Sequence, residues 1–233
     1  MNVNILRDTL LQKGATIVDY GSLLEISPDI RHNLPIGVCV VVKFSKDVIK
    51  GIIDYPTAGY MEQRNELDGL LDDFVSTGAN ILREQGYRAI AQTRVEVDKK
   101  KEKHLPILPH KTVATRAGIG WIGKCGLLVT EKYGSMIRIS TILTDAPLPS
   151  ASPINQSHCG KCMEWQSHCP AKAIKGNLWS VLTQQNDLFD IDVCRKTSKD
   201  LSQQYLSKNI SICGKCIASC PYTKRYLQTK FYP

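Results

Sequence analysis

Cysteine is concentrated near the C-terminal end of this 233-residue sequence. Seven of the nine cysteines lie close together: Cys159, Cys162, Cys169, Cys194, Cys213, Cys216 and Cys220. Two short runs, at residues 159–170 and 213–221, each place a Cys-x2-Cys pair ahead of a Cys-Pro dipeptide. Thiols spaced this closely, in a chain without an export signal, favour metal ligation over disulfide bridges. The spacing therefore predicts metal binding.

Two kinds of metal site fit these runs. Two Cys-x2-Cys pairs could form a four-cysteine zinc site. The runs also resemble the bacterial ferredoxin motif, in which the last cysteine, just before a proline, ligates the other of two iron–sulfur clusters. The prolines after Cys169 and Cys220 favour iron–sulfur clusters over zinc.

Crossed ligation assigns the seven cysteines to two clusters. Cys169, Cys194, Cys213 and Cys216 complete one [4Fe–4S] cluster, with Cys194 supplied by a segment that is predicted to be helical over residues 192–206. The other cluster receives only three: Cys159, Cys162 and Cys220. Trp165 stands where its fourth ligand is expected.

The fourth position of this second cluster has several physical solutions, because an indole has no lone pair for iron. The cluster could have three irons, or four irons with a solvent or exogenous ligand. It could instead take His158, His168 or a cysteine from elsewhere, Cys125 in particular. We predict three protein ligands on a [4Fe–4S] or [3Fe–4S] cluster. An empty site is the alternative, but the three remaining ligands keep their spacing.

The elements that must position these ligands form two predicted domains. A linker at residues 148–153 separates an α/β domain, residues 1–150, from a ferredoxin-like domain with two clusters, residues 151–233. The expected fold class is α+β. Apolar periodicity predicts helices over 4–13 and 58–85, buried strands over 36–44 and 136–143, and a strand or hairpin over 87–97. A charged loop is expected over 98–108, and a short helix and glycine-rich turn over 110–126.

Composition excludes several classes of protein. The 42% hydrophobic and 22% charged content is that of a globular protein, and no run of about 18 apolar residues or signal-peptide core is present, so we expect a cytoplasmic protein without a membrane partner. The formal charge of +8 overstates a tendency to bind nucleic acid, since cluster-bound thiolates add negative charge. Lys99–Lys101 is expected to lie in a solvated loop, and we expect no binding to DNA. Cys39 is expected to be a core residue.

Further motifs carry a family resemblance. The segments Arg116-Ala-Gly-Ile-Gly-Trp-Ile-Gly-Lys124, Tyr133-Gly-Ser135 and Ile142-Leu-Thr-Asp-Ala-Pro-Leu148, followed by the cysteine runs, resemble the epoxyqueuosine reductase family. That family is related to corrinoid-dependent reductive dehalogenases. The resemblance covers roughly residues 55–225, and the chain is similar to a short form without the family's C-terminal helical-repeat extension.

The resemblance implies a fold, a cofactor and a set of site residues. Residues 1–150 would form a sandwich-like sheet domain of the nitroreductase or corrinoid-domain kind that binds the corrinoid. Electrons would pass through the two clusters to a base-off cobalamin. The resemblance implies that six residues line the cofactor: Gly118, Gly120, Gly123, Lys124, Ser135 and Arg138. The alternative for the glycines is that they only shape a tight turn. His104 stands near the place of the family's catalytic aspartate, so His104 and His110, and more weakly Tyr60, are the catalytic candidates as proton donors.

These observations predict an oxidoreductase. The favoured hypothesis is an iron–sulfur enzyme with a cobalamin active site that reduces an unknown small-molecule or tRNA-linked substrate, and that receives electrons from a ferredoxin- or flavodoxin-type donor protein. The alternatives are a non-enzymatic iron–sulfur electron carrier or activator, and a flavin-dependent reductase on a similar scaffold.

Overall fold

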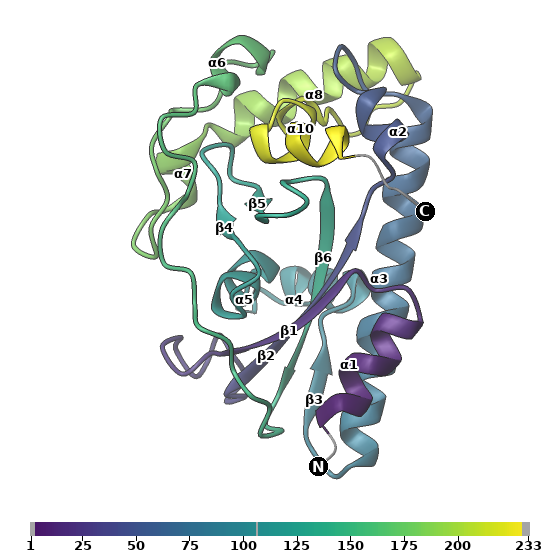
Figure 1. Ribbon diagram of the computed structural model, residues 1–233, viewed down its shortest axis with the longest axis vertical. Coiled ribbons are helices and arrows are strands. Elements are labelled where there is room, and N and C mark those ends of the chain that lie inside the picture. Colours follow the sequence, from purple (N-terminus) through teal and green to yellow (C-terminus); the bar gives the residue numbers. More distant parts are fainter. Residues whose placement is uncertain (1–2, 106, 230–233) are drawn as a thin grey trace. The chain divides into compact units, whose positions relative to one another are not determined.

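The computed structural model describes residues 3–105 and 107–229 and has a mixed α/β fold (Figure 1). The chain divides into two compact units that are interleaved in sequence. Unit 1 comprises Met1–Val42, Leu67–Ile119 and Arg138–Ile154, and unit 2 comprises Lys43–Glu66, Gly120–Ile137 and Asn155–Pro233. No helix in the described part of the chain is long and apolar enough to cross a membrane.

Unit 1 is built on a four-stranded sheet of order β1-β2-β6-β3. Its strands are β1 (Ile17–Ser22), β2 (Ile36–Lys43), β3 (Ala89–Ala91) and β6 (Ile137–Thr144). The β1–β2 and β3–β6 pairs are antiparallel. β2 and β6 are almost continuously buried, as expected for β-branched central strands covered on both faces.

Helices pack on both faces of this sheet. α1 (Val3–Gln12) and α3 (Ala58–Glu84) meet on one face, where a Cβ at Gly78 would lie 2.6 Å from Ile142 and 3.2 Å from Leu6. α5 (His110–Arg116) packs on the other face through Gly21 and Gly37, which are register partners on β1 and β2. The paired glycines leave room for the backbone of α5, since a side chain at Gly21 would collide with it.

Unit 2 is built mainly of short elements. It contains the two-stranded antiparallel sheet of β4 (Trp121–Ile122) and β5 (Leu128–Val129). Its helices are α2 (Lys46–Lys50), α6 (Glu164–His168), α7 (Gln185–Leu188), α8 (Ile191–Leu206), α9 (Lys215–Ala218) and α10 (Pro221–Gln228). The first turns of α3 also belong to this unit.

Most of the longer predicted elements are present. The helices over 4–13, 58–85 and 192–206 correspond to α1, α3 and α8, and the buried strands correspond to β2 and β6. Cys39 is confirmed as a core residue, because it is fully buried in β2. The division into units differs from the predicted boundary at residues 150 and 151, since residues 43–66 and 120–137 group with the cysteine-rich segment.

One segment was predicted wrongly. Residues 98–102, part of the charged loop predicted over 98–108, instead continue the helix α4 (Arg94–Glu102). Strand β3 ends at Ala91, before the predicted end of the strand at 97. Thr93 starts the helix by accepting a hydrogen bond from the Glu96 N–H. Lys100 is therefore not in a solvated loop: it is 8% exposed, and burial lowers its pKa.

Candidate iron–sulfur site

Two cavities in unit 2 are lined by cysteine side chains. The first, here the Trp165 cavity, is lined by Trp165 together with Cys125, Cys159, Cys162, Cys216 and Cys220. The second, here the Cys194 cavity, is lined by Cys125, Cys169, Cys194, Cys213 and Cys216. Their volumes of about 160 and 60 Å³ exceed the roughly 10–15 Å³ that a cavity needs to hold one water molecule, so each has room for more than a single ion.

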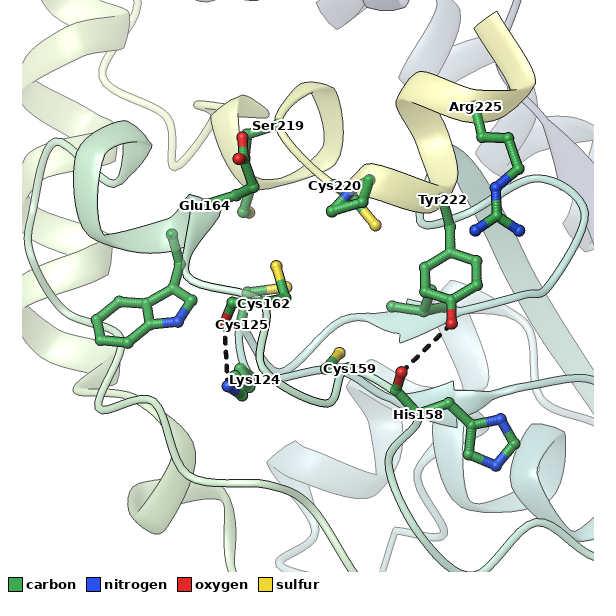
Figure 2. A pocket seen from close by; sticks show the side chains of 15 residues that line it. Lys124, Cys125, His158, Cys159, Cys162, Glu164, Ser219, Cys220, Tyr222 and Arg225 are labelled. Atoms are coloured by element: carbon green, nitrogen blue, oxygen red, sulfur yellow. Dashed lines mark hydrogen bonds between the residues drawn. The ribbon is translucent and has the colours of Figure 1, made fainter. Parts of the chain in front are cut away.

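The seven predicted metal ligands all line these cavities. Cys169, which ends the first cysteine run, lies in the cavity of Cys213, and Cys220, which ends the second run, lies in the cavity of Cys159. In the described part of the chain no cysteine forms a disulfide, and no three His, Cys, Asp or Glu side chains converge closely enough to hold one metal ion. The sulfurs instead surround two volumes, and Figure 2 shows the Trp165 cavity.

Helix α10 presents its N-terminus to one of these sulfurs. Cys220 is the residue before Pro221, the first of the helix, and the backbone N–H groups of Tyr222 and Thr223 donate hydrogen bonds to its sulfur. Burial raises the pKa of Cys220, while these two N–H groups and the Ser135 hydroxyl act in the opposite direction. A helix N-terminus stabilises a thiolate, which is the form that binds iron.

Trp165 fits a cluster at this position. It lies in α6, and its ring covers Gly176, where a Cβ would be 2.6 Å from the Trp165 Cζ2 atom. Gly176 has a φ of +89°, a conformation that a glycine adopts without strain. The indole Nε1 is buried and has no hydrogen-bond partner among the described residues. An N–H donor in this environment is suited to a cluster sulfur, because hydrogen bonds to sulfur tune cluster potentials.

Other polar groups hold the wall of the Trp165 cavity in place. Lys124, which is 8% exposed, donates from Nζ to the Cys162 carbonyl at 3.0 Å, and Tyr222 donates from its hydroxyl to the His158 carbonyl at 3.3 Å (Figure 2). The His158 ring stacks on Trp121 at a centroid distance of 4.6 Å, and in Figure 2 it points away from the cysteine sulfurs. His168 places its Nδ1 2.7 Å from the Glu164 carbonyl. Both histidines are therefore engaged outside the ring of sulfurs.

The six residues that the resemblance assigned to cobalamin contact other parts of the chain. Gly120 lies so close to the Val129 carbonyl that no side chain fits there, and a Cβ at Gly118 would lie 2.8 Å from the Ser152 carbonyl. Gly123 and Lys124 line the Trp165 cavity, and Ser135 lies beside Cys220. The glycine-rich turn is thus required, first of all, by close packing within the protein.

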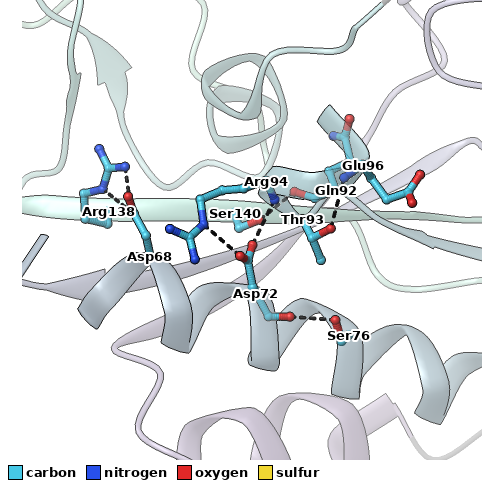
Figure 3. A network of polar contacts seen from close by, with 9 residues as sticks. All are labelled: Asp68, Asp72, Ser76, Gln92, Thr93, Arg94, Glu96, Arg138 and Ser140. Atoms are coloured by element: carbon cyan, nitrogen blue, oxygen red, sulfur yellow. Dashed lines mark hydrogen bonds and ion pairs between the residues drawn. The ribbon is translucent and has the colours of Figure 1, made fainter. Parts of the chain in front are cut away.

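Arg138, the sixth of these residues, belongs to a polar network in unit 1 (Figure 3). Its guanidinium pairs with the Asp68 carboxylate at 2.6 Å, and Asp68 is only 8% exposed. One turn further along α3, Asp72 accepts hydrogen bonds from Arg94. Asp68 and Asp72 of α3 are therefore held by arginines from β6 and from the start of α4.

The three catalytic candidates have different environments. His104 is exposed and has a φ of +53°, and His110 is largely buried at the start of α5, where its Nδ1 lies 2.8 Å from the Thr141 hydroxyl oxygen. Burial and the nearby Arg138 charge lower the pKa of His110 to about 4. Tyr60, 5% exposed, lies in unit 2 with its ring 5.2 Å from that of Phe44. Tyr60 thus serves as a core residue, while both histidines lie in unit 1.

Comparisons with known proteins agree with the site. The model of the 4Fe-4S double cluster binding domain matches residues 158–223. The chain is 39% identical to the epoxyqueuosine reductase of Escherichia coli over 123 residues, which cover 53% of this chain and 31% of that protein. It is 29% identical to that of Atelocyanobacterium thalassa over 134 residues, 54% of this chain and 42% of that protein.

Solved structures show the fold. Epoxyqueuosine reductase from Streptococcus thermophilus superposes with a TM-score of 0.59 at 16% identity, covering 96% of this chain and 67% of that one. The catabolic reductive dehalogenase NpRdhA superposes with a TM-score of 0.70 at 17% identity, covering 95% of this chain and 31% of that one.

These comparisons confirm the predicted resemblance: the chain is similar to epoxyqueuosine reductases, and its residues 158–223 are similar to the 4Fe-4S double cluster binding domain. Those relatives are reductases, the class of enzyme that the sequence predicted. The chain spans less than half of the length of the curated relatives it matches.

Proposed function

We propose that this chain is an epoxyqueuosine reductase-like oxidoreductase that passes electrons through two iron–sulfur clusters, in the Trp165 and Cys194 cavities, to a cobalamin active site. The observation that carries the proposal is the pair of cysteine-lined cavities, which together contain eight of the nine cysteines. Four cysteine thiolates are the usual ligand set of a [4Fe–4S] cluster. Eight cysteines around two cavities therefore match the need of two such clusters.

The arrangement suits transfer of electrons between the two clusters. The cavities share Cys125 and Cys216, and a thiol–thiol hydrogen bond joins these two residues. Clusters in these cavities would be direct neighbours, and a short separation favours rapid transfer of single electrons. A ferredoxin- or flavodoxin-type protein is the proposed donor, because each supplies one electron at a time.

Cobalamin is the acceptor that the resemblance implies, and when bound it would supply a reducible cobalt to the reaction. The residues proposed to lie beside it are Gly118, Gly120, Gly123, Lys124, Ser135 and Arg138. Glycines suit a large flat cofactor because backbone can approach it closely. The contacts that Lys124, Ser135 and Arg138 make within the chain would hold them in fixed positions.

The proposed substrate is a nucleoside-linked group, as part of a tRNA or as a small molecule. One of the similar solved proteins is an epoxyqueuosine reductase in complex with a modified tRNA stem loop. The formal charge of +8, although two bound clusters would lower it, is compatible with a polyanionic partner.

Metal analysis of protein purified without oxygen tests this proposal. We expect about eight irons and about eight sulfides per chain, and an absorbance that dithionite bleaches in two one-electron steps. Fewer than about five irons per chain would refute the two-cluster proposal. Cobalamin added to this protein should change to its base-off spectrum. If the protein has both clusters and leaves the cobalamin spectrum unchanged, it is an electron carrier instead. A flavin-dependent reductase would show the absorbance of its bound flavin.

A further inference from the structure

We propose that Cys125, from the turn between β4 and β5, is the fourth protein ligand of the cluster in the Trp165 cavity. This deepens the proposed function, since it rests on the presence of two clusters. It replaces a three-cysteine cluster at this position with a complete one.

Counting the sulfurs around each cavity leaves few assignments. Three cysteines line the Trp165 cavity alone (Cys159, Cys162 and Cys220), and three line the Cys194 cavity alone (Cys169, Cys194 and Cys213). Cys125 and Cys216 line both. If each cavity holds a four-cysteine cluster, each therefore takes one of these two residues.

The local spacing decides between them. Cys213 and Cys216 form a Cys-x2-Cys pair, and the two members of such a pair ligate the same cluster. Cys213 lines only the Cys194 cavity, so Cys216 completes that cluster. Cys125 is then the remaining ligand for the Trp165 cavity. Eight cysteines are thereby used, and the ninth, Cys39, is fully buried in β2.

The turn that carries Cys125 is held firmly on both sides. The Gly126 N–H donates to the Gly123 carbonyl at 2.8 Å, and the Gly123 N–H donates to the Leu127 carbonyl at 2.8 Å. Gly126 has a φ of +75°, and Phe189 lies so close to it that a Cβ would not fit. These contacts fix the place of Cys125 between the two cavities.

Trp165 and Cys125 complement each other. The indole occupies the sequence position from which a ferredoxin-type cysteine would reach the cluster, but it cannot bind iron. Cys125 supplies a sulfur to the same cavity from another element. Ligation requires only that the Cys125 thiol loses its proton and that its thiolate binds the fourth iron; no group is oxidised or reduced in this step.

Variants at three positions test the assignment, with iron and sulfide content, EPR and Mössbauer spectra as readouts. Wild type should contain about eight irons, be EPR-silent when oxidised and show no iron with a distinct ligand. Cys125→Ala should lose about one iron per chain and show the EPR signal of an oxidised three-iron cluster. Cys39→Ala, the matched control, should keep the wild-type content and spectra.

The decisive variant is Cys125→Ala combined with Trp165→Cys. A cysteine at 165 can serve only the Trp165 cavity, so this double variant should recover about eight irons and lose the three-iron signal. Loss of an iron without this rescue would place Cys125 on the other cluster and overturn the proposal. So would a Cys125→Ala protein with unchanged iron and spectra, or a wild-type protein that already shows a distinct iron.

The two proposals fail separately. A wild type with fewer than about five irons refutes the two clusters themselves. A wild type with about eight irons and an unaffected Cys125→Ala variant refutes only the ligand assignment. If Cys125→Ala does not yield folded protein, the wild-type Mössbauer spectrum alone decides, because a non-cysteine fourth ligand gives one iron in eight a distinct signal.

Discussion

Replacing His110 with glutamine should make the stability of the protein less sensitive to mild acid. His110 is largely buried, and its Nδ1 lies 2.8 Å from the Thr141 hydroxyl oxygen. That oxygen accepts a hydrogen bond from the Gln92 amide at 2.8 Å, so its own hydrogen can be donated to His110. An unprotonated Nδ1 belongs to a neutral imidazole. Burial, Arg138 and Lys100 disfavour the charged form, while Asp72 favours it.

The size of the effect follows from the two pKa values. In the unfolded chain the imidazole has its ordinary pKa of 6.5, and in the folded protein the pKa is lowered to about 4. Between these values the unfolded chain binds a proton that the folded protein does not, so stability is lost as pH falls through this window. From about pH 8 to about pH 5 the loss from this one group is about 2 kcal/mol.

Urea unfolding without oxygen, at about pH 8 and about pH 5, measures this contribution. The His110→Gln variant should lose about 2 kcal/mol less stability across this range than wild type. His104→Gln, which removes an exposed imidazole, is the matched control and should behave as wild type. An equal loss in wild type and His110→Gln would contradict the assignment of a neutral His110, and would restore its imidazolium as a candidate proton donor near neutral pH.

Two further substitutions test the environment of the cluster. Trp165→Phe removes the buried Nε1–H and should move the reduction potential of one cluster to a more negative value in an EPR-monitored titration. Trp179→Phe, at another buried tryptophan, is the control and should leave both cluster potentials unchanged. Cluster potentials in Trp165→Phe equal to those of wild type would exclude a hydrogen bond from the indole to a cluster sulfur. Gly120→Ala should lower the free energy of unfolding by about 2 to 3 kcal/mol, because its methyl group meets the Val129 carbonyl. Gly69→Ala, in open space on α3, should raise the free energy of unfolding by about 0.5 to 1 kcal/mol. Similar free energies of unfolding for the Gly120→Ala and Gly69→Ala variants would show that the glycine-rich turn can move to accept a methyl group.

Elements with strong local signals could be predicted from the sequence. The apolar run of β2 and the long amphipathic pattern of α3 specify their own structure, and Gly14 and Gly86, both with positive φ, follow the ends of α1 and α3 as expected. The helix α4 could not be predicted as easily, since its run of lysines resembles a solvated loop. Its hydroxyl cap at Thr93 is the signal that could have identified it.

Cys125 shows the limit of local reasoning about the site. The two cysteine runs identify their own ligands because the spacing within each run is the signal. Cys125 is far from both runs in the sequence and lies in a glycine-rich turn, so its pattern carries no mark of metal binding. From the sequence alone, Cys125 was only one of several candidates for the fourth ligand of the cluster that has Trp165 in place of a cysteine. Its place at both cavities depends on how residues 120–137 group with the cysteine-rich segment.

A ligand from this turn would change what the second cluster depends on. The 4Fe-4S double cluster match covers residues 158–223, whereas Cys125 and the close contact of Gly120 with Val129 lie before it. The cluster in the Trp165 cavity would then form only where the β4–β5 turn is already folded, because an ordered turn is what brings the fourth sulfur to it. Metal binding to such a site contributes directly to folding stability. The tightly packed glycines of the turn would therefore contribute to cluster assembly, because they hold Cys125 in place before any further cofactor binds.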